Sequence, residues 1–151
     1  MSAATQSHRI VSDSAEATRA HGEALGRRLR AGDRVNLVGP LGAGKTVFVQ
    51  GIARGMGLAA DFPVTSPTYA RMNLYPTDPP LYHWDLYRVS DGAAADAELS
   101  ALGFGDEVAG PGVVVVEWAD RGEQATSDDV AILVRLSYGE TPDERIIEIT
   151  T

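Results

Sequence analysis

Two stretches of the chain carry apolar residues at the spacing of one helix face. In the first, Asp13 and Glu16 resemble a capping box, and the apolar stripe that follows them extends to about Arg30. The second stripe lies at Val49, Ile52, Ala53 and Met56, which are spaced i, i+3, i+4 and i+7. These patterns predict two amphipathic helices. A third, shorter helix is predicted from Ala93 to Leu102, before a glycine.

Short apolar and aromatic runs predict the strands. Residues 35–38 form one run, and residues 113–116 are four consecutive valines, which indicates a strand buried on both faces and a partly parallel sheet. Aromatic-rich pieces at 69–75 and 81–87 flank a proline-rich turn and predict a hairpin. Alternation over 130–136 and a further run at 145–150 predict a second hairpin at the carboxyl end.

These elements predict one α/β domain, compact or three-layered. Its central sheet is mixed and partly parallel, and helices flank it. The chain has 151 residues, of which 44% are hydrophobic, so it is long enough to bury a real core. No composition shift marks an internal boundary. We therefore assign residues 10–151 to the domain and residues 1–9 to an amino-terminal tail.

Composition excludes several classes of function. The chain has no cysteine, which excludes disulfides, thiolate zinc sites and cysteine nucleophiles. The net charge of −8 argues against broad direct capture of nucleic acid, because that needs a cationic surface. A role beside nucleic acid remains open through a partner. The apolar runs are too short to span a membrane, so we expect a cytoplasmic protein without a membrane partner.

A phosphate-binding loop stands between the strand at 35–38 and the second helix. Residues 39–46, Gly-Pro-Leu-Gly-Ala-Gly-Lys-Thr, match G-x-x-x-x-G-K-[ST] at every fixed position. Its glycines let main-chain N–H groups face one anion, and the helix start adds a positive dipole end. This context disfavours a chance glycine-rich turn and predicts a fold of the P-loop NTPase type.

Two residues of this loop suit a nucleotide and its metal ion. Lys45 supplies a point charge for the β and γ phosphates, and the Thr46 hydroxyl is suited to Mg²⁺. We therefore expect ATP and Mg²⁺ as cofactors. The cofactor-binding residues predicted here are Gly39, Leu41, Gly42, Ala43, Gly44, Lys45, Thr46 and Val47.

Two acidic residues stand at the ends of predicted strands. Glu117 comes directly after the four valines, where an acid is expected to hold the Mg²⁺ shell of such a loop; the alternative is a solvated residue at a strand end. Asp85 stands at the end of an aromatic strand and is predicted to orient water or share the metal shell. Its alternative is an ordinary turn-forming or capping aspartate.

Several neighbouring residues carry weaker signals. Ser66 and Thr68 lie on a proline-stiffened loop that is either a γ-phosphate sensor or a simple turn. Trp118 is read as packing in the core or at a rim more readily than as a nucleotide stacker. His83 has no matching histidine and is read as structural.

The separated motifs together resemble the TsaE (YjeE) family of bacterial ATPases. The matching segments are Gly39–Thr46, Thr65–Tyr69, His83–Arg88, Leu102–Phe104 and Val116–Trp118. The resemblance implies a small P-loop fold that binds ATP and Mg²⁺ and assists TsaD and TsaB. In that system the partners install a threonylcarbamoyl group on the tRNA adenosine next to the anticodon, so tRNA would be met only through the complex.

The resemblance also implies roles for individual residues. Lys45 and Thr46 would serve the nucleotide and metal, and Glu117 the metal or the attacking water. Asp85 would join the catalytic acids, Thr68 would act in a switch-like loop, and Trp118 would lie beside the nucleotide. The sequence departs from the family at two positions, Pro40 for an acidic residue and Val47 for a frequent threonine.

Other functions remain open from the residues themselves. The chain could be a nucleotide-gated assembly module that does not need hydrolysis, or a small-molecule kinase, because the same loop can pass a phosphoryl group to a hydroxyl. A guanine-specific switch is disfavoured because Asn36 and Asn73 are both followed by leucine, which leaves no N-K-x-D motif.

Overall fold

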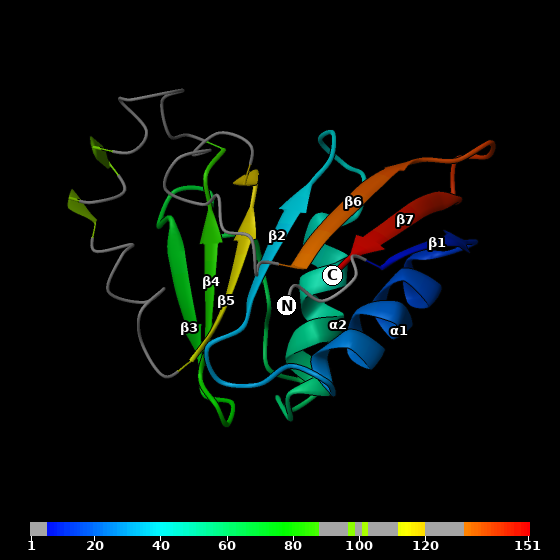
Figure 1. Cartoon of the computed structure of the whole chain (residues 1–151). Coiled ribbons are helices and arrows are strands. Elements are labelled where there is room, and N and C mark those ends of the chain that lie inside the picture. Colours follow the sequence, from blue (N-terminus) through cyan, green and yellow to red (C-terminus); the bar gives the residue numbers. More distant parts are fainter. Residues whose placement is uncertain (1–5, 88–96, 99–100, 103–111, 120–131) are drawn as a thin grey trace.

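The computed structural model describes residues 6–87, 97–98, 101–102, 112–119 and 132–151. These residues build a seven-stranded sheet, in the order β1-β7-β6-β2-β5-β4-β3, with two helices packed against it (Figure 1). The strands are β1 (Ser7–Ser12), β2 (Arg34–Val38), β3 (Met72–Tyr75), β4 (Leu81–Asp85), β5 (Val113–Glu117), β6 (Ile132–Tyr138) and β7 (Arg145–Thr150). The helices are α1 (Ala15–Gly26) and α2 (Lys45–Gly55).

The centre of the sheet is parallel and its edges are antiparallel. Strand β2 runs parallel to β5 and β6, and β5 runs parallel to β4. The outer pairs β1–β7, β6–β7 and β3–β4 are antiparallel. The predicted α/β class and the mixed, partly parallel sheet are confirmed. Because β2, β4 and β5 point the same way, the segments that follow them meet at one edge of the sheet.

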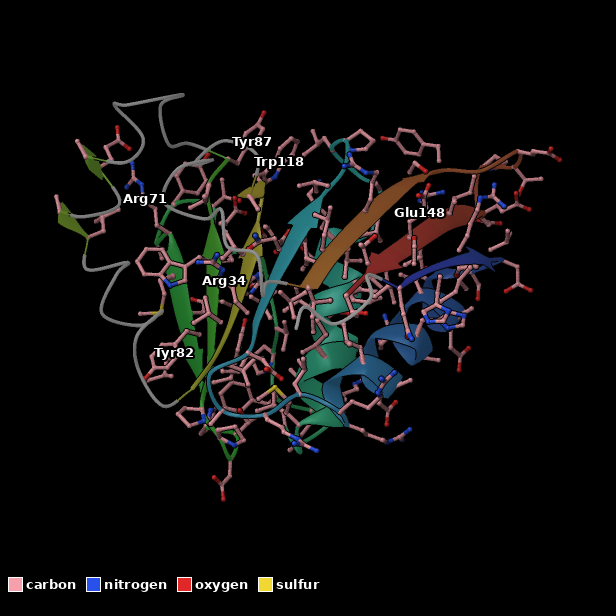
Figure 2. All side chains as sticks on the ribbon, in the orientation of Figure 1. Arg34, Arg71, Tyr82, Tyr87, Trp118 and Glu148 are labelled. Carbon is pink, nitrogen blue, oxygen red and sulfur yellow. The ribbon has the colours of Figure 1, made fainter. Side chains whose placement is uncertain are left out.

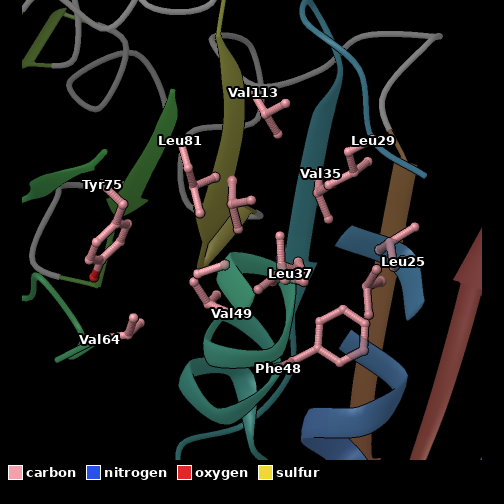
Figure 3. Close-up of a cluster of buried hydrophobic side chains, with 14 of the residues drawn as sticks. Leu25, Leu29, Val35, Leu37, Phe48, Val49, Val64, Tyr75, Leu81 and Val113 are labelled. Carbon is pink, nitrogen blue, oxygen red and sulfur yellow. The ribbon is translucent and has the colours of Figure 1, made fainter. Parts of the chain in front are cut away.

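The valine strand β5 divides the core. Val113 and Val115 pack on the face covered by α2, in a cluster that also contains Leu37 and Phe48 (Figure 3). Val114 and Val116 pack on the opposite face, around Trp84. All four valines are buried, which confirms the predicted strand with two buried faces.

Glycines allow α1 and α2 to lie side by side against the same sheet face (Figure 1). A Cβ atom on Gly51 would lie 2.0 Å from the carbonyl oxygen of Arg19, and one on Gly22 would lie 2.3 Å from that of Phe48. No real Cβ makes such contacts, so larger residues would push the helices apart. This close packing fixes the position of α2, whose first residues belong to the loop of residues 39–46.

Three predictions at the amino terminus are wrong. Helix α1 is capped by Ser14, whose hydroxyl accepts a hydrogen bond from the Ala17 amide at 3.0 Å, and not by Asp13; the helix ends at Gly26 rather than near Arg30. The predicted tail of residues 1–9 is too long, because residues 7–9 pair with β7 as part of β1. An edge strand of this kind is held by its partner and has little pattern of its own.

The other elements differ from prediction mainly in length. The aromatic hairpin is confirmed as β3 and β4, with strands shorter than the predicted 69–75 and 81–87. The carboxyl-terminal hairpin is confirmed as β6 and β7. Most of the helix predicted for 93–102 lies outside the described residues, as do residues 130 and 131. Across the described ranges, no helix has the length and apolar content to span a membrane.

Candidate functional site

The loop of residues 39–46 connects β2 to α2 and depends on glycine at defined positions. Gly44 is the N-cap of α2 and has a left-handed φ of 102°. A Cβ atom on Gly39 would lie 2.4 Å from the carbonyl oxygen of Leu136 on β6. Because this N-cap is a glycine, it has no side chain to accept a hydrogen bond from the first N–H groups of α2. The first turn of α2 also contains no acidic residue. The helix therefore presents a positive dipole end to the loop.

The side chain of Lys45 links the two ends of this loop by hydrogen bonds. Its Nζ donates hydrogen bonds to the carbonyl oxygens of Gly39, at 2.7 Å, and Pro40, at 2.9 Å. The same ammonium lies 3.9 Å from the centroid of the Trp118 ring. These contacts hold a buried positive charge between the loop and the end of β5.

Thr46 and Glu117 meet although they are 71 residues apart in the chain. The Thr46 hydroxyl lies 3.2 Å and 3.3 Å from the two carboxylate oxygens of Glu117. Only 2% of Glu117 is exposed. A buried carboxylate is costly unless it is hydrogen-bonded, so this contact is part of what stabilises Glu117 at the end of β5. One hydroxyl and one carboxylate are oxygen donors of the kind that Mg²⁺ prefers.

A second partner of Glu117 is His83, which is fully buried on β4. Its Nε2 lies 2.5 Å from Oε2 of Glu117, and its Nδ1 lies 3.5 Å from the hydroxyl of Tyr75. Burial raises the pKa of Tyr75 above its ordinary value of 10.0, and the Glu117 charge adds to the rise; hydrogen bonds from Asn73 and to Thr65 act in the opposite direction. The phenol is therefore neutral and retains its proton.

Asp85 lies beside Glu117 in the register of β4 and β5. Its Oδ2 accepts hydrogen bonds from the hydroxyls of Ser66 and Thr68, the latter at 3.0 Å. Its Oδ1 accepts one from the amide of Tyr87 at 2.8 Å. The hydrogen bond from the Tyr87 amide is the contact expected of an ordinary turn-forming aspartate, the alternative given for Asp85 from sequence. The first two place the Ser66–Thr68 loop against the same strand ends as the loop of residues 39–46.

Trp118 and Tyr87 form the aromatic side of the site. Their ring centroids are 4.9 Å apart with a tilt of 50° (Figure 2). Trp118 has a left-handed φ of 58°, an uncommon backbone conformation for a bulky residue. Its place beside Lys45 agrees with rim packing, whereas Trp84 belongs to the core.

A pocket of about 360 Å³ opens between these groups. Ten of the twelve residues predicted for the site line it, and the other two, Gly39 and Ala43, lie in the loop that forms its wall. The lining residues are Leu41, Gly42, Gly44, Lys45, Thr46, Val47, Ser66, Thr68, Asp85, Tyr87, Glu117 and Trp118.

Two residues that support the loop were missed by sequence reasoning. The hydroxyl of Tyr138 donates to the carbonyl of Leu41, and Nη2 of Arg145 donates to that of Gly42 at 3.3 Å. Arg145 also lies 5.2 Å from the centre of the Tyr138 ring. No local motif marks either residue. They reach the loop because β6 is the parallel neighbour of β2.

The role of His83 was likewise not apparent from sequence alone, although a signal was present. His83 stands two residues before Asp85, so both side chains leave β4 on one face. In the parallel register, Glu117 is the neighbour of Asp85 on that face. Knowledge of this pairing would have placed His83 near the acid.

Comparisons with known proteins agree on one family. The family model "Threonylcarbamoyl adenosine biosynthesis protein TsaE" matches residues 12–147. A tRNA threonylcarbamoyladenosine biosynthesis protein TsaE of Streptomyces coelicolor is 38% identical over 127 residues, which cover 82% of each chain. Its namesake in Mycobacterium leprae is 46% identical over 115 residues, covering 72% of this chain and 70% of that protein. The crystal structure of Bacillus subtilis YdiB matches with a TM-score of 0.76 at 28% identity, covering 99% of this chain and 88% of the other.

Proposed function

This chain belongs to the TsaE family, and we propose that it binds and hydrolyses ATP as an accessory protein of tRNA threonylcarbamoyladenosine biosynthesis. In this proposal its turnover supports the cycle of TsaD and TsaB, which transfer the threonylcarbamoyl group. The observation that carries the proposal is the meeting of Thr46 and Glu117 beside the loop of residues 39–46. A phosphate cradle and a pair of oxygen donors for Mg²⁺ are thereby joined in one pocket.

The loop residues account for binding. The main-chain N–H groups of residues 39–46 and the start of α2 would surround the phosphates, and Lys45 would bring its charge to the β and γ groups. When Mg²⁺ is bound with ATP, it supplies positive charge to the phosphoryl group that is transferred. Thr46 and Glu117 are the residues that would hold this ion. Glu117 would also orient the attacking water. The substitutions Pro40 and Val47 leave these groups unchanged.

The acid Asp85 and the Ser66–Thr68 loop account for control of the reaction. Hydrogen bonds from Ser66 and Thr68 hold the loop against Asp85 at the wall of the pocket. A loop in this place is suited to respond to the γ phosphate. Trp118 and Tyr87 would cover one side of the nucleotide and limit the access of bulk water.

The proposed partners follow from charge as well as from the family. With a net charge of −8, the chain is poorly suited to hold tRNA by itself. We therefore assign tRNA binding and group transfer to TsaD and TsaB, and place all of them in the cytoplasm.

The test is ATP hydrolysis by the purified chain, alone and with TsaD, TsaB and tRNA. We expect release of inorganic phosphate that rises in the complete mixture and is lost in Lys45→Ala and Glu117→Ala. Circular dichroism spectra equal to that of the wild type serve as the folding control. Unchanged turnover in both variants would refute the proposal, and phosphate appearing on an acceptor in place of water would indicate a kinase.

A second candidate is a nucleotide-gated assembly module, favoured by the contacts of Asp85. Both of its carboxylate oxygens already accept hydrogen bonds from the chain, which suits a structural role in the loop. In that case ATP binding alone would assemble the partners. A non-hydrolysable ATP analogue that sustains tRNA modification over many cycles would select this function over the first.

A further inference from the structure

A row of polar groups crosses three neighbouring strands beneath the pocket. It runs from the hydroxyl of Tyr75 on β3, through the ring of His83 on β4, to the carboxylate of Glu117 on β5 and then to Thr46 on α2. Tyr75, His83 and Glu117 are all buried. Such a row is unusual in a core otherwise built from aliphatic side chains and Phe48, because unpaired polar groups there are costly.

The contacts determine which nitrogen of His83 carries a proton. An ionised Glu117 only accepts hydrogen bonds, so the 2.5 Å contact requires a proton on Nε2. On the other side of the ring, Nδ1 faces the Tyr75 hydroxyl at 3.5 Å, whose single proton goes either to Nδ1 or to the carbonyl oxygen of Thr65, also at 3.5 Å. The contact with Glu117 is therefore the one that selects a ring with a proton on Nε2. Both tautomers fill the same volume, but only a ring with a proton on Nε2 supplies Glu117 with a hydrogen-bond donor.

We propose that His83 is a positioning residue for the ATPase site, which holds Glu117 through an Nε2–H hydrogen bond. The inference rests on the proposed function and adds a residue to it. His83 fixes Oε2 from the side of β4, while Thr46 approaches the carboxylate from α2. The carboxylate is thus oriented before Mg²⁺ or water reaches it. Without the histidine donor, Glu117 can rotate away from Thr46, and the oxygen pair that would take the ion is lost.

The first test needs no nucleotide. Correlation spectra of ¹⁵N-labelled protein distinguish the two histidine tautomers, and the His83 signals are identified by their loss in His83→Gln. We expect a proton on Nε2 of His83, and a change at His83 in Glu117→Gln that leaves His8 and His21 unaffected. A ring without a proton on Nε2 would overturn the inference, because it has no proton to give to Glu117.

The second test compares two neutral amides at one position. The terminal nitrogen of glutamine is as many bonds from Cα as Nε2 of histidine, whereas that of asparagine is one bond shorter. His83→Asn should therefore lose the donor and His83→Gln should retain it. With TsaD, TsaB and tRNA present, we expect kcat to fall about 10- to 100-fold in His83→Asn and to recover in His83→Gln, with the KM for ATP unchanged in both.

The alternatives give different results. If His83 only fills space, both variants lower the melting temperature and kcat together without recovery in His83→Gln, which overturns the inference. Equal turnover in both variants and the wild type also overturns it, while leaving the proposed function intact. If the wild type itself has no turnover, the proposed function fails, and the Mg²⁺ dependence of ATP binding in the two variants replaces kcat as the readout.

Discussion

The contact between Thr46 and Glu117 can be tested by a substitution that removes one donor and little else. Thr46→Val replaces the hydroxyl with a methyl group of similar size and keeps a β-branched residue in the first turn of α2. In the wild type this hydroxyl lies 3.2 Å and 3.3 Å from the carboxylate oxygens of Glu117. Because only 2% of Glu117 is exposed, few water molecules can reach its carboxylate to replace the lost donor.

The expected cost follows from this geometry. A hydrogen bond to a charged group contributes about 1.5–3 kcal/mol, and the long distances place this one in the lower part, at about 1.5–2 kcal/mol. In a domain of this size, about 1 kcal/mol lowers the melting temperature by about 2–4 °C. We therefore expect Thr46→Val to melt about 3–8 °C below the wild type when nucleotide and Mg²⁺ are absent.

The assay is thermal unfolding in a chelating buffer, with Thr46→Ser as the matched control. Serine keeps the hydroxyl and loses one methyl group, which costs at most about 0.8 kcal/mol. In a Glu117→Gln background the difference between valine and threonine should shrink, since the charged acceptor is gone. Equal melting of Thr46→Val and the wild type, or an equal loss in Thr46→Ser, would contradict the proposed contact.

Three further predictions concern the frame around the site. Gly51→Ala should destabilise the protein by about 1–3 kcal/mol in urea unfolding, since its Cβ would lie 2.0 Å from the Arg19 carbonyl oxygen; an unchanged midpoint would mean that the helices are not so close. Asp85→Asn replaces one of the two acceptor oxygens with an NH2 group, so the side chain can no longer accept from both the Ser66–Thr68 loop and the Tyr87 amide; this should increase limited proteolysis of that loop and lower kcat, and resistance equal to the wild type would count against the role of Asp85 in holding the loop. Because the Tyr75 pKa is raised in the fold, its neutral form contributes stability that is complete below pH 10 and lost as the pH rises through the folded pKa. Urea midpoints should therefore fall more from pH 9 to pH 11 in the wild type than in Tyr75→Phe, and parallel curves would refute this.

The parts of the molecule that sequence could predict are those with local patterns. The loop of residues 39–46 is recognised by its glycines and by its place between a strand and a helix. The four valines before Glu117 predict a buried parallel strand. Glu117 and Asp85 each stand at the end of a predicted strand, and both are predicted to lie near the loop. The structure brings them there, and the catalytic roles of these residues stay predictions.

The parts that could not be predicted depend on pairing between distant segments. Strand β1 exists through its partner β7, so residues 7–9 were assigned to a tail. Ser14 and Asp13 are both good cap residues, and only the path of the chain selects the serine. His83 acquires its meaning from the register between β4 and β5. Tyr138 and Arg145 reach the loop from a hairpin about a hundred residues away.

The most direct test of the account is a crystal structure of this chain with a non-hydrolysable ATP analogue and Mg²⁺. We expect the phosphates against the main-chain amides of residues 39–46, Lys45 at the terminal phosphates, and the ion on the side of Thr46 and Glu117. Phosphates bound elsewhere, or an ion with no ligand or bridging water from Thr46 or Glu117, would contradict it.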